Sequence, residues 1–429
     1  MTDHEPQDRR TKPTRALVLH PDIRGAERRK EPIHALDEAV ALAAALPGLD
    51  VVEADVVPLR EVRPATIFGT GKMDEIKTTI EAREVELVLI DGPVTPVQQR
   101  NLEDAWKVKL LDRTGLILEI FADRAATREG VLQVELAALS YQRTRLVRAW
   151  THLERQRGGL GFVGGPGETQ IEADRRALDE AITRIRRQLE KVTRTRGLHR
   201  AARAKVPFPV VALVGYTNAG KSTLFNRLTG AEVMAEDMLF ATLDPTMRGV
   251  TLEGGTRVIL SDTVGFISDL PTQLVAAFRA TLEEVLAADL ILHVRDVAHP
   301  DTDSQAEDVD TILGDLGVPE DVPRIELWNK ADMLPEDARA ALEAIADRSE
   351  DALLISALDG TGVTEAVDAI TAQLEGVRRR QTVDIPFSEG RRRAWLHERD
   401  VIEAERETDE GWSLDVRWTD RQRMDFEAL

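Results

Sequence analysis

A glycine-rich segment between two apolar runs has the residue types and spacing that could bind phosphate. Residues 215–222 read GYTNAGKS; they follow the apolar run 210–214, and the next residues, 223–228, favour a helix. Glycines let backbone N–H groups close around a phosphate at a helix N-terminus, which carries partial positive charge. Lys221 could reach the β- and γ-phosphates, and the Ser222 hydroxyl could ligate Mg²⁺. The sequence therefore predicts a nucleotide-binding P-loop.

Two later segments could complete a phosphate and magnesium site. Asp262 follows the apolar run 258–260 and opens the pattern DTVG, in which the carboxylate can hold Mg²⁺ and the Gly265 N–H can bond a γ-phosphate. Residues 240–246, FATLDPT, lie between the P-loop and DTVG and form a candidate switch segment. Such a segment needs a threonine that contacts both Mg²⁺ and the γ-phosphate. Thr242 and Thr246 both fit by position, so spacing leaves this choice open.

The segment NKAD, residues 329–332, predicts which base is bound. The Asp332 carboxylate matches the N1–H and the exocyclic N2 amine of guanine, which adenine does not offer. Asn329 can bond N7 and brace the loop. The apolar run 353–355 leads to residues 356–358, SAL, whose backbone N–H groups can meet guanine O6. Because a buried carboxylate that faces adenine would lose its donors, the pattern favours GTP over ATP.

One usual catalytic group is missing from this set. Ras-type GTPases carry a glutamine directly after the DxxG glycine, and that glutamine orients the attacking water. This chain has Phe266 there. Since a phenyl ring cannot orient water by hydrogen bonding, we expect slow hydrolysis. A backbone group, another side chain, a monovalent cation or a partner would have to complete the site.

The region before the P-loop alternates between strand-like and helical patterns. The apolar runs 16–20, 87–90 and 109–112 have the length of strands, and residues 36–46 have helical periodicity. We therefore expect a small α/β domain over residues 15–124, preceded by a disordered tail over residues 1–14. Residues 69–72, GTGK, resemble half of a phosphate loop, but Thr66 stands where the first glycine should be and Met73 where Ser or Thr should be. This favours a structural turn.

Two heptad patterns follow this domain. In residues 132–153 leucines recur at spacings of 4-3-7-7, and in residues 178–192 apolar residues step 4-3-4-3. Residues 158–167 connect the two and contain six glycines in ten residues. We expect an antiparallel coiled-coil hairpin over residues 125–206 with this Gly-rich loop at its tip. Composition alone favours a connector for the loop, although a loop at the tip of a stalk could reach into a partner.

Charge is distributed unevenly along the chain. Its 429 residues include 56 Lys+Arg and 76 Asp+Glu, and a net charge of -20 taken whole argues against a nucleic-acid partner. Residues 141–205, however, hold 16 Lys+Arg and 7 Asp+Glu, a net of +9, which leaves -29 for the rest. This contrast favours an anionic partner for the hairpin. Only 10 of the 56 bases are lysine, which is typical of a salt-adapted organism; a GC-rich genome is the alternative.

Other counts exclude whole classes of protein. The chain has no cysteine, which excludes a disulfide framework and a cysteine-ligated metal site. No apolar run reaches the ~20 residues of a transmembrane helix. The first residues lack the basic start and apolar core of a signal peptide. We therefore expect a cytoplasmic protein without a membrane span.

Together the motifs GYTNAGKST, FATLDPT, DTVGF and NKAD resemble those of the HflX GTPases of the Obg–HflX group. Residues 91–103, 112–130 and 158–176 agree as well, so the resemblance covers roughly residues 15–375. It implies a GTPase that binds the large (50S) ribosomal subunit, with the Gly-rich loop near the peptidyl-transferase region; some members separate stalled ribosomes. It also implies that Thr242 is the switch threonine and that Phe266 is usual for the family.

The expected fold class is α/β: a P-loop GTPase domain over residues 207–376, preceded by the small α/β domain and the antiparallel helical hairpin, with a small C-terminal extension over residues 377–429. We expect GTP and Mg²⁺ as ligands, ribosomal RNA of the large subunit as partner, and a monomer. The alternative is a GTP-dependent scaffold that acts through protein–protein contacts of its coiled-coil hairpin.

The predicted site residues fall into three groups. The catalytic groups are Lys221, Thr242 and Gly265, and the metal ligands are Ser222, Thr242 and Asp262. The nucleotide contacts are Gly215, Tyr216, Thr217, Asn218, Ala219, Gly220, Lys221, Ser222, Thr223, Phe240, Ala241, Thr242, Leu243, Asp244, Asp262, Thr263, Val264, Gly265, Asn329, Lys330, Ala331, Asp332, Ser356, Ala357 and Leu358.

Overall fold

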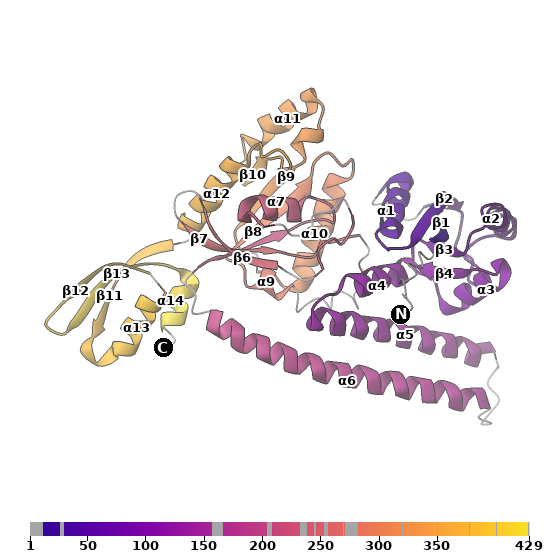
Figure 1. The fold of residues 1–429 in the computed structure, drawn as a ribbon, viewed down its shortest axis with the longest axis horizontal. Helices are drawn as coiled ribbons and strands as arrows, with labels where there is room; N and C mark the ends of the chain where they lie inside the picture. Colours follow the sequence, from indigo (N-terminus) through magenta and orange to yellow (C-terminus); the bar gives the residue numbers. More distant parts are fainter. Residues whose placement is uncertain are drawn as a thin grey trace, which may run out of the picture. The chain divides into compact units, whose positions relative to one another are not determined.

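The structure of the chain is a computed structural model, and Figure 1 shows its helices and strands. Its residues group into two compact units. The first comprises Met1–Arg187, Glu236–Leu243 and Asp269–Ala277, and the second Gln188–Ala235, Asp244–Ser268 and Phe278–Leu429. Both combine helices with sheets, so the predicted α/β class is confirmed. The structure describes residues 12–25, 30–156, 166–203, 208–231, 238–243, 246–252, 256–268, 270, 282–319, 321–349, 351–376, 378–399, 401–427 and 429.

The first unit contains a four-stranded parallel sheet in the order β2-β1-β3-β4. Its strands are β1 (Thr14–Ile23), β2 (Leu49–Leu59), β3 (Leu87–Ile90) and β4 (Lys109–Asp112), and its helices are α1 (Pro32–Ala44), α2 (Thr70–Ala82), α3 (Pro96–Trp106) and α4 (Arg113–Arg124). All four residues of β3 are buried, as expected for a parallel strand covered on both faces. The strands predicted at 87–90 and 109–112 are confirmed. Sequence reasoning missed β2, because Glu53 and Asp55 interrupt its apolar pattern.

Two long helices, α5 (Arg128–Gln156) and α6 (Pro166–Arg203), follow and run side by side in Figure 1. The Arg143 guanidinium of α5 pairs with the Asp179 carboxylate of α6 at 2.8 Å. Both helices were predicted, and Ile182 and Ile185 of the heptad seam are buried. The buried face of α5 is wider than its leucine seam, since α5 also packs against α3 and α4. Most of the Gly-rich loop, residues 158–165, lies outside the described residues.

Polar side chains of α5, half-buried, attach this helix to the buried Asp112 of the first unit's sheet. The Tyr141 hydroxyl donates to both oxygens of the Asp112 carboxylate, at 2.6 and 2.7 Å. Arg145 donates to Asp112 Oδ2 and to the Val94 carbonyl, each at 3.1 Å. Burial, together with the Asp112 carboxylate, raises the pKa of Tyr141 well above its usual range, so the phenol stays protonated and keeps donating. The base of the hairpin is thus held by several directional bonds.

The second unit contains a six-stranded sheet in the order β10-β9-β8-β5-β7-β6, in which only β6 is antiparallel to its neighbour among the described strands. Its core includes Val211, Leu213 and Leu292, all almost fully buried. The strands are β5 (Val210–Val214), β6 (Thr246–Thr251), β7 (Arg257–Asp262), β8 (Leu290–Asp296), β9 (Arg324–Asn329) and β10 (Ala352–Leu354); the helices are α7 (Lys221–Thr229), α9 (Glu283–Leu286), α10 (Thr302–Leu316), α11 (Glu336–Ala346) and α12 (Val363–Gly376), with a short 3₁₀ helix η1 (Ala331–Met333). Parallel strands bring their carboxyl ends to one edge, which is where ligands bind in open α/β sheets.

The C-terminal part of the second unit has a sheet and a core of its own. Its antiparallel sheet has the order β11-β13-β12. Leu396, Leu414 and Trp418 are buried at the centre of this core. The elements are β11 (Arg378–Pro386), η2 (Phe387–Glu389), α13 (Gly390–Glu398), β12 (Ile402–Glu407), β13 (Gly411–Thr419) and α14 (Asp420–Glu427). Throughout the described part of the chain, no helix is long and apolar enough to cross a membrane.

A buried histidine in β8 is expected to make stability depend on pH. His293 is 1% exposed, and its Nδ1 has no hydrogen-bond partner within the described residues. Burial lowers the pKa of His293 to about 4, although Glu326 and Asp310 oppose the shift and Arg295 and Arg324 add to it. An unfolded histidine has a pKa of about 6.5. Between about pH 6.5 and about pH 4, His293 is therefore protonated in the unfolded chain but neutral in the folded chain. As the pH falls through this range, the free energy of unfolding decreases by about 1.4 kcal/mol per pH unit.

The measurement is urea unfolding at about pH 7 and about pH 5 for the wild type and for His293→Leu. The loss of stability on acidification should be smaller in the variant by about 2 kcal/mol. Equal losses in the two proteins would contradict the prediction, because every other titrating group is shared.

Candidate functional site

The P-loop connects β5 to α7, as predicted, and two of its glycines are required by close contacts. Gly215 has φ 150°, and a Cβ there would collide with the backbone carbonyl of Val294. Gly220 has φ 95°, and a Cβ there would collide with the side-chain amide of Asn329. Positive φ values and missing space both exclude larger residues. The loop therefore passes directly against β8 and against the predicted base-binding segment.

Lys221 lies buried beneath the loop. It is 6% exposed, and its Nζ donates to the carbonyls of Gly215 at 3.1 Å and Tyr216 at 2.7 Å. Burial lowers the pKa of Lys221 to about 8, and the Asp262 carboxylate opposes this shift. A buried ammonium that donates to carbonyls can exchange them for phosphate oxygens, which carry negative charge and form stronger bonds. The position suits a phosphate-binding lysine.

Two of the predicted magnesium ligands meet directly. The Ser222 hydroxyl donates to Asp262 Oδ2 at 2.7 Å, and Asp262 is fully buried at the end of β7. A hydroxyl and a carboxylate are hard oxygen donors, which Mg²⁺ prefers, and one such carboxylate beside substrate phosphates is its usual protein site. The donor set therefore fits Mg²⁺.

The switch segment is divided between the two units. Thr242 belongs to the first unit, whereas Ser222 and Asp262 belong to the second, so its role as a third magnesium ligand stays a prediction. Within the first unit, the ring of Phe240 packs edge-on against Phe121 of α4 with centroids 4.6 Å apart. Thr246, the alternative, begins β6 and is the register partner of Asp262. Asp244 lies outside the described residues.

The DxxG segment is paired with the P-loop through backbone hydrogen bonds. Thr217 N–H donates to the Phe266 carbonyl at 2.7 Å, and Phe266 N–H donates to the Gly215 carbonyl at 3.1 Å. A Cβ at Gly265 would lie 2.8 Å from Thr217 Cα, so only glycine fits. The Phe266 side chain is 1% exposed and packs inside the protein. The hydroxyl of Thr263 donates to the Leu213 carbonyl at 2.6 Å, which is a structural contact.

One asparagine ties the phosphate and base segments together. Asn329 Nδ2 donates to the Ala219 carbonyl at 2.7 Å, and Asn329 Oδ1 accepts from Ala357 N–H at 2.8 Å. The Ser356 hydroxyl donates to Asp332 Oδ1 at 2.7 Å. Because a carboxylate has two acceptor oxygens, Asp332 can hold Ser356 with one oxygen and guanine donors with the other. The structure thus brings the NKAD and SAL segments to the P-loop.

Sequence reasoning missed two residues that support the base loop. Arg227 of α7 donates to the Ala357 carbonyl at 2.7 Å and also to the Leu358 carbonyl. Lys330, whose φ is 68°, pairs with Asp296 at the end of β8 at 2.8 Å. Neither Arg227 nor Asp296 falls in a recognisable motif, so no sequence signal pointed to them.

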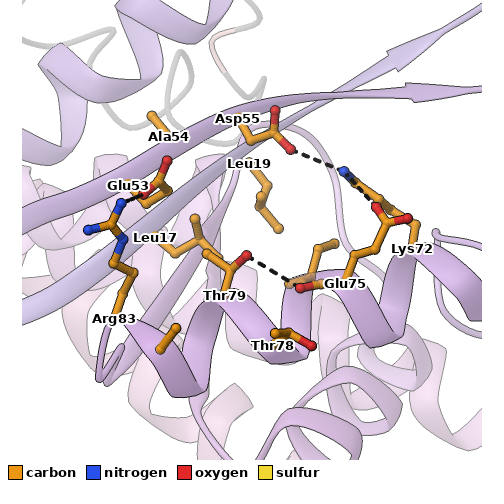
Figure 2. Close-up of a pocket in the computed structure, with 12 residues that line it drawn as sticks. Leu17, Leu19, Glu53, Ala54, Asp55, Lys72, Glu75, Thr78, Thr79 and Arg83 are labelled. Carbon is orange, nitrogen blue, oxygen red and sulfur yellow. Dashed lines mark hydrogen bonds and ion pairs between the residues drawn. The ribbon is translucent and has the colours of Figure 1, made fainter.

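The GTGK segment of the first unit borders a separate groove of about 430 Å³ (Figure 2). Lys72 pairs there with Asp55 at 3.2 Å and with Glu75 at 3.3 Å, and Arg83 pairs with Glu53 at 3.0 Å. Three acids against two bases give the groove a negative balance, which disfavours a phosphate. The charge balance agrees with a structural role for this segment, but the predicted turn is wrong, because Gly69 is the N-cap of α2 and residues 70–72 belong to the helix itself.

Comparisons with known proteins found matching family profiles and a solved structure that aligns with the chain. Four family profiles match the chain in order: GTP-binding GTPase N-terminal (34–122), GTP-binding GTPase Middle Region (124–203), 50S ribosome-binding GTPase (210–330) and HflX C-terminal domain (341–428). A GTP-binding protein from Sulfolobus solfataricus in complex with GDP aligns with a TM-score of 0.45 and 23% identity, over 84% of this chain and 98% of that one.

Two curated relatives are similar over most of their length. The GTPase HflX of Magnetococcus marinus is 51% identical over 369 residues, which cover 86% of this chain and 84% of that protein. The GTPase HflX of Escherichia coli is 45% identical over 371 residues, which cover 86% of each. With its P-loop, its guanine-binding segment and these relatives, the chain is a GTP-binding GTPase, and it belongs to the HflX family.

Proposed function

We propose that this GTPase acts on the large ribosomal subunit and that ribosomal RNA is the anionic partner of its hairpin. The carrying observation is the net charge of +9 over residues 141–205 in a chain whose total is -20. RNA binding depends on basic side chains that neutralise phosphates. The family description of residues 210–330 as a 50S ribosome-binding GTPase supports the same partner. We propose a monomeric protein of the cytoplasm.

The proposal extends to the ligands and to the individual site residues. Lys221 and Gly265 N–H would hold the γ-phosphate, and Asp332 would select guanine. Ser222, Asp262 and Thr242 would hold Mg²⁺, which when bound neutralises charge on the phosphates. We also propose that the domains end at residues 124, 206 and 376, as the sequence predicts. The separation of stalled ribosomes is the activity that the family resemblance suggests.

The hairpin is attached to the first unit by hydrogen bonds at its base, which supports a role in contacting a partner with its tip. Tyr141 and Arg145 bind Asp112 at the end of β4, so the base of α5 is fixed on the first unit. Exposed arginines at 184, 186 and 187 continue along α6. The alternative, a scaffold that pairs its helices with another protein, is less favoured, because helix-pairing faces alternate in charge sign, whereas most of the charged residues of this hairpin are arginine. We also propose that the acidic remainder of the chain reflects a high-salt environment.

The test is GTP hydrolysis with and without purified ribosomal subunits, at the native salt of the source. Hydrolysis should be slow alone and rise with large subunits, and the protein should sediment with them in the presence of a non-hydrolysable GTP analogue. Absence of both effects would overturn the ribosomal proposal and leave the scaffold.

Deleting the Gly-rich loop separates GTP hydrolysis from the proposed contact with the ribosome. A variant without residues 158–167 should keep its intrinsic GTPase rate, because the P-loop and NKAD contacts are formed within residues 215–358. Stimulation by large subunits should fall at least about tenfold, since a truncated tip cannot reach its target. A ten-residue Gly-Ser replacement is the matched control for hairpin closure. Unchanged stimulation in the deletion variant would show that the tip is not the contact.

A further inference from the structure

Tyr216, the second residue of the P-loop, reaches the segment that follows DxxG. Its side chain is buried, with 4% of the residue exposed. Its hydroxyl lies 2.7 Å from Ser268 Oγ and accepts a hydrogen bond from Ser268 N–H at 2.8 Å. The Ser268 hydroxyl in turn donates to Asp308 Oδ2 of α10 at 2.8 Å. All three residues belong to the second unit.

The chemistry of these groups fixes the direction of each hydrogen bond. Asp308 as a carboxylate can only accept, so the single proton of the Ser268 hydroxyl points to it. The Ser268 oxygen must therefore accept from the Tyr216 O–H. The Tyr216 oxygen accepts from Ser268 N–H at the same time. Tyr216 thus holds both the backbone and the side chain of Ser268, and α10 anchors the far end.

These side-chain hydrogen bonds lie beside backbone hydrogen bonds that pair the P-loop with the DxxG segment. Thr217 N–H bonds the Phe266 carbonyl at 2.7 Å, Phe266 N–H bonds the Gly215 carbonyl at 3.1 Å, and Tyr216 and Phe266 form a parallel bridge. Gly265 lies one residue before this bridge, with no space for a Cβ against Thr217. The carbonyl of Tyr216 itself accepts from Lys221 Nζ at 2.7 Å. Residue 216 therefore contacts both the phosphate-binding lysine and the segment that carries Gly265.

We propose that Tyr216 is a positioning residue for GTP hydrolysis, which acts by holding Ser268, and with it Gly265 and the Phe266 backbone, in register with the P-loop. The need for such a residue follows from Phe266, whose ring cannot orient water. Without a glutamine, the rate depends on how closely the backbone groups around Gly265 are held against the γ-phosphate and the attacking water. Small displacements in such a site are costly, since about 1 Å can reduce a rate by about 100-fold.

The test is Tyr216→Phe, which removes the hydroxyl and keeps the buried ring. We expect the single-turnover rate of GTP hydrolysis to fall about 10- to 100-fold. The affinities for GDP and for a non-hydrolysable GTP analogue should stay within about threefold, because the Tyr216 hydroxyl is bonded to Ser268 and the P-loop backbone is unchanged. Ser268→Ala, which breaks the same chain from the other end, should lower the rate to a similar degree. In the double variant the combined loss should be smaller than the sum of the two, since both substitutions remove the bond between the Tyr216 and Ser268 hydroxyls, and only Tyr216→Phe also removes the acceptor of the Ser268 N–H.

Two further kinds of variant, conservative and remote, show whether Tyr216 positions the catalytic groups or only packs in the core. Asp308→Asn keeps an acceptor for the Ser268 hydroxyl and should retain most of the rate, whereas Asp308→Leu should not. Thr371→Val removes a hydroxyl that donates to the Val367 carbonyl at 2.8 Å on α12, and it should leave the rate unchanged. A wild-type rate in both Tyr216→Phe and Ser268→Ala would overturn the proposal. Rate and nucleotide affinity falling together, in parallel with the melting temperature, would also overturn it and make Tyr216 a packing residue.

Discussion

Lys221→Ala is expected to remove most of the nucleotide affinity and to abolish measurable hydrolysis. The Lys221 ammonium is buried and donates to the Gly215 and Tyr216 carbonyls, so it is positioned to exchange them for phosphate oxygens. Two charge-assisted hydrogen bonds contribute about 3–4 kcal/mol. The affinity for GTP should therefore fall about 100- to 1,000-fold. Titration of a fluorescent GTP analogue measures this loss directly.

The same substitution should leave the fold intact. Burial already lowers the pKa of Lys221 to about 8, so the charged side chain is a cost to the nucleotide-free protein, and its removal should not lower the melting temperature. Lys77→Ala, on the exposed face of α2, is the matched control and should bind GTP normally. Wild-type GTP affinity in Lys221→Ala would show that the P-loop assignment is wrong.

Asp332→Asn is expected to change the preferred base from guanine to xanthine. The Ser356 hydroxyl donates to Asp332 Oδ1 at 2.7 Å, and an asparagine oxygen can accept the same bond. That bond would turn the Nδ2 amine of the new side chain toward the base. Guanine presents donors there, which an amine cannot accept, whereas xanthine presents a carbonyl at position 2. Affinity for GTP should fall about 1,000-fold or more, because the donors of guanine are left unpaired.

The expected gain of XTP binding is as informative as the loss of GTP binding. Asp332→Asn should bind and hydrolyse XTP at close to the wild-type rate with GTP, since the phosphate site is unchanged. Competition between GTP and XTP for a fluorescent analogue gives the ratio of affinities. Asp337→Asn, an exposed carboxylate at the start of α11, is the control and should keep the preference for GTP. If Asp332→Asn still preferred GTP to XTP, the assignment of the base contact would fail.

Much of the fold could be predicted from local pattern. The apolar runs at 87–90 and 109–112 and the two heptad helices were found because short buried strands and seams have distinct periodicities. The edge strand β2 was missed for the opposite reason, since it is only partly covered and tolerates acidic residues. The wide buried face of α5 could not be predicted either, because burial there comes from contacts with α3 and α4, which a heptad pattern within α5 does not record.

The sequence by itself determined the nucleotide, because phosphate and guanine are bound by consecutive residues whose spacing a motif records. It also located a basic hairpin inside an acidic chain, since charge is additive along a segment. Only the tertiary structure decided how those segments are held together. Asn329 joins the Ala219 carbonyl across 110 residues, Arg227 joins the Ala357 carbonyl across 130, and Tyr216 joins Ser268 across 52. Such pairs leave no spacing signature, because chain reversals of any length can produce the same hydrogen bond.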